Sequence, residues 1–528
     1  MKGPDWATSK SVYITKPEEQ VRQDYERALH YDYGYPKTVM DIEVIIQRGS
    51  TRREKADLVI YEADDGRRRD QSRDILGIIE TKRPDRKDGI KQLASYMSAT
   101  SAVWGVWTNG KEIEFLLRDP SSGQVRRDVI FEIPAYGASI ESVGTHTYAD
   151  LVPATNLKLI FRRLLNELYT NTNISRREKL GNEMTKLLFC KLQDEQATRP
   201  AAIPDFRVGI QDHTTGFEAV AQRINALFTR VKAELADDGV FSEHDEITLE
   251  HKSIAYVVGE LQRYSLLQTD EDVVGSAFEV FAESKFAGEK GEFFTPRSVV
   301  HTAIQLIDPK PGERIIDPAC GSGGFLICAL QHIWRTMDET SPWSRLSEIN
   351  RTEQKRRIAK DTIYGLDKES DLVRIAKAYM AIIGDGKSRI AQANSLHAPA
   401  DFEGAARDLV VTDDQFEAFD VVLTNPPFGS KKTKVAVVDS AQFDLGHKWG
   451  KVKGKPEYTK KNEARKTPPQ ELFIERCFQM LKPGGRMAIV LPETIGHAPT
   501  KKYIVQYIRR HGSIRAVVDL PHGTCQRL

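Results

Sequence analysis

The spacing of apolar residues changes twice along this chain of 528 residues. In the first part, from about residue 15 to 140, a helical pattern that begins near Pro17 is followed by short apolar runs separated by polar turns. This pattern predicts a small α/β unit with a second helix at 88–100. Its strands are expected at 41–48, 55–62, 74–82, 103–108 and 111–118, with the turn Asn109-Gly110 between the last two.

In the second part, from about 155 to 285, apolar residues recur at i, i+3 and i+4. The clearest examples are 157–168 and 179–194. Because this spacing puts the apolar side chains on one face of a helix, it predicts a helical bundle. No residue of this part stands out as a candidate for chemistry, which favours packing and spacing as its role.

In the third part, from about 286, strand and helix patterns alternate. This alternation predicts a doubly wound parallel sheet that binds its ligand at the carboxyl ends of the strands. The polar, lysine-rich stretch 431–466 is expected to be the longest loop. The strands are expected near 314–317, 362–367, 389–392, 419–424, 485–491 and 514–520.

Composition limits the class of protein without naming it. Apolar residues make up 40% of the chain and charged residues 29%, which is typical of a globular protein with room for about three domains. The formal charge of +1 gives no overall signature of nucleic-acid binding. Local patches remain, because 48–87 is dense in Lys and Arg and 431–466 holds eleven Lys and Arg against four Asp and Glu.

The cysteines and the N-terminus indicate a cytoplasmic protein. The five cysteines have neither a CxxC pair nor the spacing of metal ligands, so reduced thiols are expected. The first ten residues lack the apolar stretch of a signal peptide, and no apolar run is long enough to span a membrane.

The tetrapeptide Asn425-Pro426-Pro427-Phe428 follows the apolar strand expected at 419–424. The Asn425 side-chain oxygen and the Pro426 carbonyl can both accept hydrogen bonds from an exocyclic NH₂ group. The prolines fix the backbone, so that the carbonyl is held in place. Phe428 offers a stacking face for a base taken out of its duplex.

A glycine-rich turn stands upstream, directly after the strand expected at 314–317. Glycines at such a turn let the backbone approach a bound nucleoside, although a turn of this kind alone would also suit a dinucleotide. Asp367, at the end of the next strand, can accept hydrogen bonds from both hydroxyls of a ribose. The residues of the turn that we single out are Asp317, Ala319, Gly321 and Gly323.

These motifs together resemble the DNA methyltransferases that make N6-methyladenine, and in particular the modification subunit of type I restriction-modification systems. The resemblance implies a Rossmann-like sheet, S-adenosylmethionine as cofactor, and a segment with Thr295 and Pro296 packed on its methionine part. It also implies that Asn394, where the family often has an acid, holds the adenine amino group. A simple turn residue is the alternative for Asn394.

A second group of residues lies in the first part. Asp57 opens one strand, and Glu80 and Lys82 end another, where their spacing puts them on the same face. Two carboxylates can hold Mg²⁺, and a neighbouring lysine can orient or deprotonate a water. Gln92 and Tyr96 share one side of the following helix.

This group resembles the PD-(D/E)xK nucleases and, with the segment after Pro17, the N-terminal nuclease domain of type I restriction subunits. The alternative is a DNA-binding remnant without activity. Glu19 is either an additional acidic member of the site or a charge that complements the helix dipole. The cluster Arg67–Arg69 is interpreted as a solvated turn, with phosphate contact as the other interpretation.

The order of the parts resembles the single-chain type IIG restriction-modification enzymes. We expect a nuclease-like domain at 1–145, a helical domain of the modification-subunit type at 150–285 and a methyltransferase domain, incomplete at its C-terminus, at 286–528. The motor motif GxxxxGK[ST] does not occur. The expected partners are double-stranded DNA and either a specificity subunit or a missing target-recognition domain. The alternative function is a catalytically idle DNA- or cofactor-binding subunit, or a truncated remnant.

The lysine-rich stretch 431–466 follows the tetrapeptide directly. It could neutralise phosphates that flank a flipped base, which would make DNA binding depend on salt. The alternative is a disordered, solvated loop.

Overall fold

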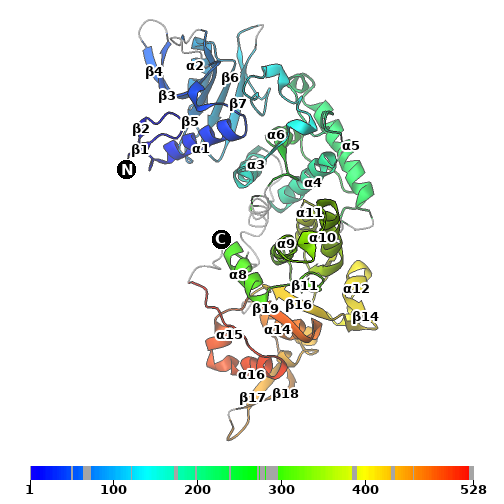
Figure 1. The fold of residues 1–528 in the computed structure, drawn as a ribbon. Helices are drawn as coiled ribbons and strands as arrows, with labels where there is room; N and C mark the ends of the chain where they lie inside the picture. The colour runs from blue at the N-terminus through cyan, green and yellow to red at the C-terminus, as the bar shows by residue number, and fades with distance from the viewer. Residues whose placement is uncertain are drawn as a thin grey trace. The chain divides into compact units, whose positions relative to one another are not determined.

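The computed structural model of the chain forms two compact units, Met1–Phe281 and Ala282–Leu528 (Figure 1). The predicted boundary at 145–150 falls inside the first unit and stays a prediction. The structure describes residues 2–48, 52–63, 70, 73–119, 122–171, 177–196, 199–236, 240–269, 273, 280, 295–382, 389–429, 434–455 and 457–521.

The first unit begins with a six-stranded mixed sheet of order β3-β4-β5-β6-β7-β8. Only β5 and β6 pair in parallel among these strands, because α2 (Ile90–Ala99) crosses between them. The sheet has two apolar faces, one packed on α1 (Pro17–Tyr31) and one on α2. The strands are β3 (Met40–Arg48), β4 (Arg52–Tyr61), β5 (Ile75–Thr81), β6 (Trp104–Thr108), β7 (Ile113–Arg118) and β8 (Val125–Arg127), which confirms the predicted strands to within a few residues.

The rest of the first unit is mainly helical, as predicted. A short parallel pair of β9 (Val152–Pro153) and β10 (Tyr264–Ser265) joins the two ends of this part, and a buried polar group connects it to the α/β part. The carboxylate of Asp32 accepts hydrogen bonds from the hydroxyls of Tyr264 and Thr155. The long helices among its described residues are α3 (Leu157–Asn171), α4 (Arg177–Glu195), α5 (Glu218–Glu234) and α6 (His251–Leu261).

The second unit contains a five-stranded sheet of order β13-β12-β11-β16-β19, and every pairing in it is parallel. This confirms the predicted parallel sheet. The chain runs outward from β11 to β13 and then returns to pair β16 with β11, so the strand order reverses at β11. Ligands of such sheets bind at the carboxyl ends of the strands where the order reverses. The strands are β11 (Ile315–Asp317), β12 (Ile363–Asp367), β13 (Arg389–Gln392), β16 (Phe419–Thr424) and β19 (Leu481–Ile489).

Helices cover both faces of this sheet (Figure 1). On one face α12 (Gly404–Val410) and α14 (Pro469–Met480) close an apolar core with the alternate strand residues Ile316, Leu366 and Val422. On the other face lies α9 (Gly324–Glu339), so near to β12 that a side chain at Gly365 would meet Leu326. The sheet is therefore doubly wound, as predicted. The remaining long helices are α8 (Arg297–Ile307), α10 (Glu348–Thr362), α11 (Ser370–Ile382) and α16 (Lys502–His511).

Two predictions for the second unit are wrong. Residues 514–520 do not form a strand, because no described strand pairs with them and a strand is stable only when its backbone groups find partners. Their apolar side chains are exposed, Val517 by 79%. The stretch 431–466 is not one long loop: its described part contains α13 (Val437–Ser440) and the antiparallel hairpin of β17 (His447–Lys451) and β18 (Tyr458–Ala464).

None of the helices in the described part of the chain has the length and apolar character needed to cross a membrane. Four cysteines, Cys190, Cys320, Cys328 and Cys477, are buried free thiols, and Cys525 lies outside the described residues.

A buried charge cluster holds the N-terminal segment on α1. Arg22 pairs with Asp5, Glu19 and Glu26, and its distances to these carboxylates are 3.0, 2.6 and 2.9 Å. Three carboxylates share one cation, and Glu26 is fully buried. Burial raises the pKa of Glu26 to about 8, although Arg22 opposes the rise.

This cluster predicts a pH dependence of stability. Between its ordinary pKa of 4.5 and about 8, Glu26 loses its proton in the unfolded chain and keeps it in the folded chain, so its contribution to stability falls as pH rises. Glu26→Gln keeps the uncharged form at every pH. The urea midpoint of this variant should therefore rise relative to the midpoint of wild type when the pH is raised from about 5 to about 8.

The control is Glu43→Gln. Glu43 is exposed, and a hydrogen bond from Lys55 lowers its pKa, so its titration is complete below this pH range. A constant difference between Glu26→Gln and wild type over the range would show that Glu26 is ionised in the folded protein.

Candidate functional site

Asn425 lies directly after β16, at the carboxyl end of the parallel sheet. Its side-chain nitrogen donates a hydrogen bond of 2.8 Å to the hydroxyl of Thr295, which stands just before α8. Its side-chain oxygen is buried and has no hydrogen-bond partner in the described part of the chain. Because one end of the amide is fixed by Thr295, the other end is a buried acceptor held in one orientation.

Sequence reasoning placed Thr295 with the cofactor and missed its contact with Asn425. The two residues are 130 positions apart, and no local pattern connects them. Pro296 follows Thr295 as the residue before the first turn of α8. Pro426 is buried, and Pro427 and Phe428 are half-buried.

The backbone after the tetrapeptide is held by α14. The side-chain oxygen of Gln470 accepts a hydrogen bond of 2.8 Å from the amide of Gly429. One turn further along the helix, the two oxygens of Glu475 accept bonds of 2.9 Å from the amides of Asp444 and Leu445. Both side chains of α14 are buried, so their hydrogen bonds are shielded from water.

Arg476, the next residue of α14, connects this segment to the loop after β13. It donates a hydrogen bond of 2.7 Å to the carbonyl of His397 and lies over the rings of Phe416 and Phe443. Its burial lowers the pKa of the guanidinium to about 9. Sequence reasoning missed these residues of α14. A usable signal was the presence of charged residues within an apolar stretch, Leu472-Phe-Ile-Glu-Arg-Cys477.

The glycine turn after β11 is open on one side. Gly321 and Gly323 both have positive φ, at 54° and 88°, which favours glycine. No described atom lies within 4 Å of the position that a side chain at Gly321 or Gly324 would occupy. The turn therefore leaves space beside its backbone.

Asp367, at the end of β12, contacts this turn directly. Its carboxylate accepts hydrogen bonds of 2.9 Å from the amide of Gly321 and 3.0 Å from the amide of Glu369. Asp367 is half-buried. The strand order thus brings together the glycine turn and Asp367, as predicted.

Asp317 and Asn394 hold loops in place. The Asp317 carboxylate is 1% exposed and accepts a bond of 2.9 Å from the amide of Ala319, inside the turn. Burial raises the pKa of Asp317 to about 7. The Asn394 oxygen accepts a bond of 3.1 Å from the amide of Leu396, which is the geometry of the turn residue named as its alternative.

The second group of predicted residues comes together on β4 and β5. Lys82 lies 2.5 Å from Glu80 and 4.0 Å from Asp57. The amide and hydroxyl of Thr81 both donate to one oxygen of Asp57. Lys82 contacts one oxygen of Glu80, and the second oxygen is buried without a hydrogen-bond partner in the described part of the chain.

Burial dominates the electrostatics of this group. It raises the pKa of Glu80 to about 8, with a further contribution from Asp57, and it also raises the pKa of Asp57. For Lys82 burial acts to lower the pKa, but the carboxylates of Glu80 and Asp57 outweigh it and the pKa is raised. The described residues contain no set of three or more His, Cys, Asp or Glu placed to hold a metal ion.

The neighbours of this group differ in part from those expected. Glu18, which sequence reasoning missed, lies 3.9 Å from Lys82, whereas Glu19 is bound to Arg22 on the buried side of α1. Gln92 donates to the hydroxyl of Tyr96, so the predicted pair on α2 is in contact. Arg67–Arg69 lie outside the described residues.

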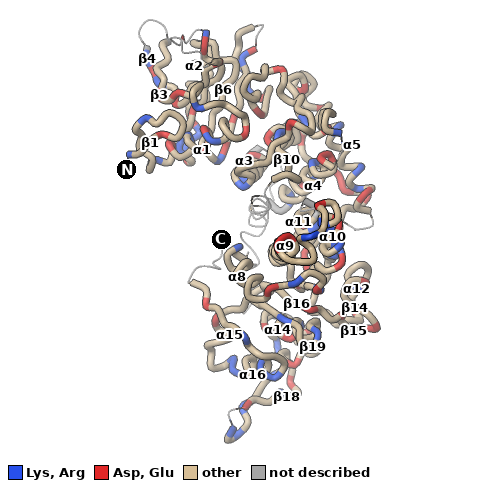
Figure 2. Tube along the Cα trace, in the orientation of Figure 1, with Lys and Arg blue, Asp and Glu red and all other residues tan. Residues whose placement is uncertain are grey.

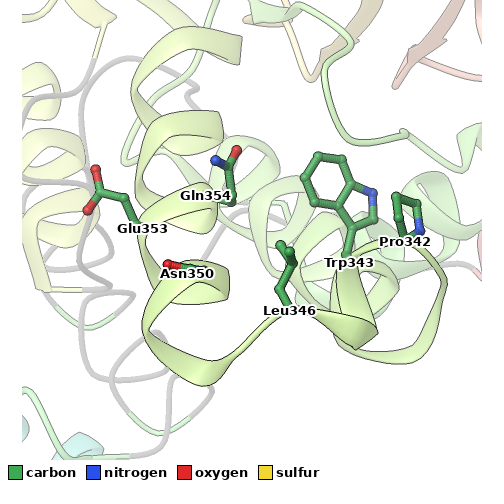
Figure 3. A pocket seen from close by; sticks show the side chains of 6 residues that line it. All are labelled: Pro342, Trp343, Leu346, Asn350, Glu353 and Gln354. Atoms are coloured by element: carbon green, nitrogen blue, oxygen red, sulfur yellow. The ribbon is translucent and has the colours of Figure 1, made fainter.

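A separate pocket of about 360 Å³ lies where α9 connects to α10. Figure 3 shows the indole of Trp343 and the side chain of Leu346 along it. None of the predicted site residues lines it; its lining consists of Pro342, Trp343, Leu346, Asn350, Glu353 and Gln354.

Comparison with known families decides the class of the second unit. Residues 269–525 match the family N-6 DNA Methylase, and the match contains the glycine turn, Asp367 and Asn425. The chain contains an N-6 DNA methylase domain. Residues 17–134 match the family of the type I restriction enzyme R protein N terminus, and this match contains Asp57, Glu80 and Lys82.

Curated relatives agree with the methylase domain. The chain is 28% identical over 271 residues to the type I restriction enzyme EcoEI methylase subunit of Escherichia coli, covering 51% of this chain and 46% of that protein. It is 23% identical over 263 residues to the type II restriction enzyme and methyltransferase RM.BcgI of Heyndrickxia coagulans, covering 48% and 33%. The chain thus spans about half or less of the length of these relatives.

Solved structures give low similarity scores. A modification subunit of a putative type I restriction enzyme from Vibrio vulnificus YJ016 aligns with a TM-score of 0.43 and 17% identity, over 68% of this chain and 75% of that one. The type IIG restriction endonuclease BpuSI aligns with a TM-score of 0.38 and 13% identity, over 93% and 52%.

The contact between Gln470 and Gly429 gives a test of how the methylase domain holds its tetrapeptide. Gln470→Leu removes the only acceptor that the structure records for the Gly429 amide, whereas Gln470→Glu keeps an oxygen there. Loss of one buried hydrogen bond should raise hydrogen exchange at Gly429 roughly tenfold in the Leu variant and far less in the Glu variant. Mass spectrometry of the peptide that contains Gly429 measures the change, and equal exchange in both variants would show that Gln470 does not hold this amide.

Proposed function

We propose that the methylase domain transfers a methyl group from S-adenosylmethionine to N6 of adenine in DNA, within a restriction-modification system. The observation that carries the proposal is the side chain of Asn425. Its amide is oriented by Thr295 and leaves a buried oxygen without a described partner at the carboxyl end of β16. A buried acceptor costs free energy unless a ligand donates to it, and the amino group of adenine is such a donor.

In this proposal, Asn425 and the carbonyl of Pro426 accept the two hydrogens of the adenine amino group. These bonds favour a tetrahedral nitrogen and free its lone pair for attack. S-adenosylmethionine supplies an electrophilic methyl group when bound, and the amino nitrogen gives up one proton to solvent after the transfer. Phe428 stacks on the flipped base, and Pro427 keeps the loop rigid. The protein contributes mainly by positioning.

The residues at the sheet edge fit S-adenosylmethionine. Asp367, which already accepts hydrogen bonds from the amides of Gly321 and Glu369, would also accept hydrogen bonds from the ribose hydroxyls. The open backbone at Gly321 would lie against the nucleoside, and Gly323 would keep the turn tight beside it. The remaining residues proposed for this site are Thr295 and Pro296 beside the methionine part, Asn394 beside the adenine, and Asp317 and Ala319 within the turn.

We also propose that the N-terminal α/β part is a Mg²⁺-dependent endonuclease of the PD-(D/E)xK type. Asp57 and Glu80 would hold the ion, and Lys82 would orient the attacking water. The support is the contact of Lys82 with Glu80 and the buried Glu80 oxygen without a described partner. Mg²⁺ needs the ionised carboxylate, so the raised pKa of Glu80 should fall when the ion binds.

Both activities would require target recognition on double-stranded DNA. We propose that a specificity subunit, or a target-recognition domain elsewhere, supplies it, as expected from relatives named as subunits of type I enzymes. Cleavage should then be confined to DNA that lacks the methyl mark, because a chain that modifies and cuts the same target must be restrained.

Asn425→Ala tests the methyl transfer. It removes the proposed acceptor for the target base but leaves the glycine turn and Asp367 in place. Transfer of labelled methyl groups to target DNA should fall by about two to three orders of magnitude, while calorimetry with S-adenosylmethionine should show affinity within a few-fold of wild type. Asn350→Ala, on α10, is the matched control and should keep full activity. Full methylation by Asn425→Ala would contradict the role of Asn425, and absence of S-adenosylmethionine binding in wild type would favour an idle subunit.

Lys82→Ala tests the nuclease. The intact enzyme is incubated with its specificity module, Mg²⁺ and unmethylated target DNA, and nicking is followed on gels. Lys82→Ala should lose nicking by at least about a hundredfold and keep methylation, because Lys82 lies in the other unit of the chain. Lys87→Ala is the control, since Lys87 is exposed and paired with Glu112. If wild type does not nick this DNA, the domain is a remnant without nuclease activity.

A further inference from the structure

The hairpin of β17 and β18, here called the lysine arm (His447–Ala464), is fixed to the methylase domain along one face. Trp449 stacks on Tyr503 of α16 at 5.7 Å between ring centroids. Gln506 of α16 bonds to both the amide and the carbonyl of Tyr458. The other face and the tip of the arm carry exposed polar residues.

The tip of the arm is strongly basic (Figure 2). Lys451, Lys453 and Lys455 are exposed, and no ion pair is recorded for them in the described part of the chain. The nearby acids Asp444 and Glu463 are paired with Lys460 and Lys448, and the exposed Glu457 is the one acid at the tip itself, against three lysines. The arm therefore has a local excess of positive charge in a chain whose formal net charge is only +1.

The arm is anchored on the same helix as the tetrapeptide. Glu471 of α14 accepts hydrogen bonds from Arg465, at the end of the arm, and from Tyr503. The residue before it, Gln470, holds the amide of Gly429. Two consecutive buried residues of α14 thus fix the base of the arm and the backbone beside Phe428.

We propose that the lysine arm binds backbone phosphates of duplex DNA beside the base that Asn425 holds. This inference rests on the proposed methyl transfer to DNA, because it assigns a surface to that substrate. Lysine is a flexible point charge suited to phosphate contacts that do not depend on sequence. The exposed positions of the arm hold Lys, Thr, Asn, Glu and one Gly, whereas protein interfaces are depleted in Lys and Glu and need apolar anchors. The composition therefore favours DNA over a protein partner.

The test replaces Lys451, Lys453 and Lys455 together by Gln in the full chain. Binding to a fluorescent synthetic duplex is measured by anisotropy over a series of salt concentrations. Each phosphate contact contributes about 0.9 to the slope of log affinity against log salt, so the slope should become shallower by roughly two to three. The matched control is the triple replacement of Arg356, Arg357 and Lys360 by Gln, which removes three exposed positive charges from α10 and should change the slope by far less.

An unchanged slope in the arm variant would overturn the proposal, and so would an equal change in the control or an absence of duplex binding by wild type at low salt. Loss of association with a specificity subunit at unchanged slope would assign the arm to a protein partner instead. Failure of the methyl transfer itself is distinguishable, because Asn425→Ala and S-adenosylmethionine binding report on it independently of salt.

Discussion

The parallel pairing of β11 with β16 is the constraint on which the methylase site depends. It brings together the glycine turn and the tetrapeptide, which stand about a hundred residues apart in the chain. β12 pairs on the other side of β11 and places Asp367 against Gly321. Since the carboxyl ends of parallel strands meet at one edge, three loops converge there without any of them being long.

Buried polar side chains of α14 hold the tetrapeptide loop and two neighbouring segments. Gln470, Glu471, Glu475 and Arg476 are consecutive or about one turn apart on α14, and each bonds to a loop backbone or to a charged side chain. Burying such groups costs free energy unless they are paired. Their effect is to hold positions: the tetrapeptide, the lysine arm and the loop after β13 share one helix as their support.

In the N-terminal unit, buried and half-buried charged side chains form two clusters. Around Lys82 it gathers Glu80, Asp57 and Glu18, and burial, with a smaller contribution from Asp57, raises the pKa of Glu80. The cluster around Arg22 is built in the same way, although it lies on the buried side of α1 and joins the N-terminal segment to it. Both clusters leave a buried carboxylate oxygen without a hydrogen-bond partner in the described part of the chain, on Glu80 in the first and on Glu26 in the second.

The sequence by itself determined the elements and the candidate residues. Periodicity predicted the strands of both sheets and the helical part, and local motifs singled out Asn425, Asp367, Asp57, Glu80 and Lys82. The tertiary structure decided contacts that join distant residues: Thr295 with Asn425, Gln470 with Gly429, and Glu18 rather than Glu19 beside Lys82. It also turned the expected loop at 431–466 into a hairpin and left 514–520 without a strand partner. The physical reason is that periodicity records which face of an element is apolar, whereas hydrogen-bond partners and strand neighbours depend on which elements pack together.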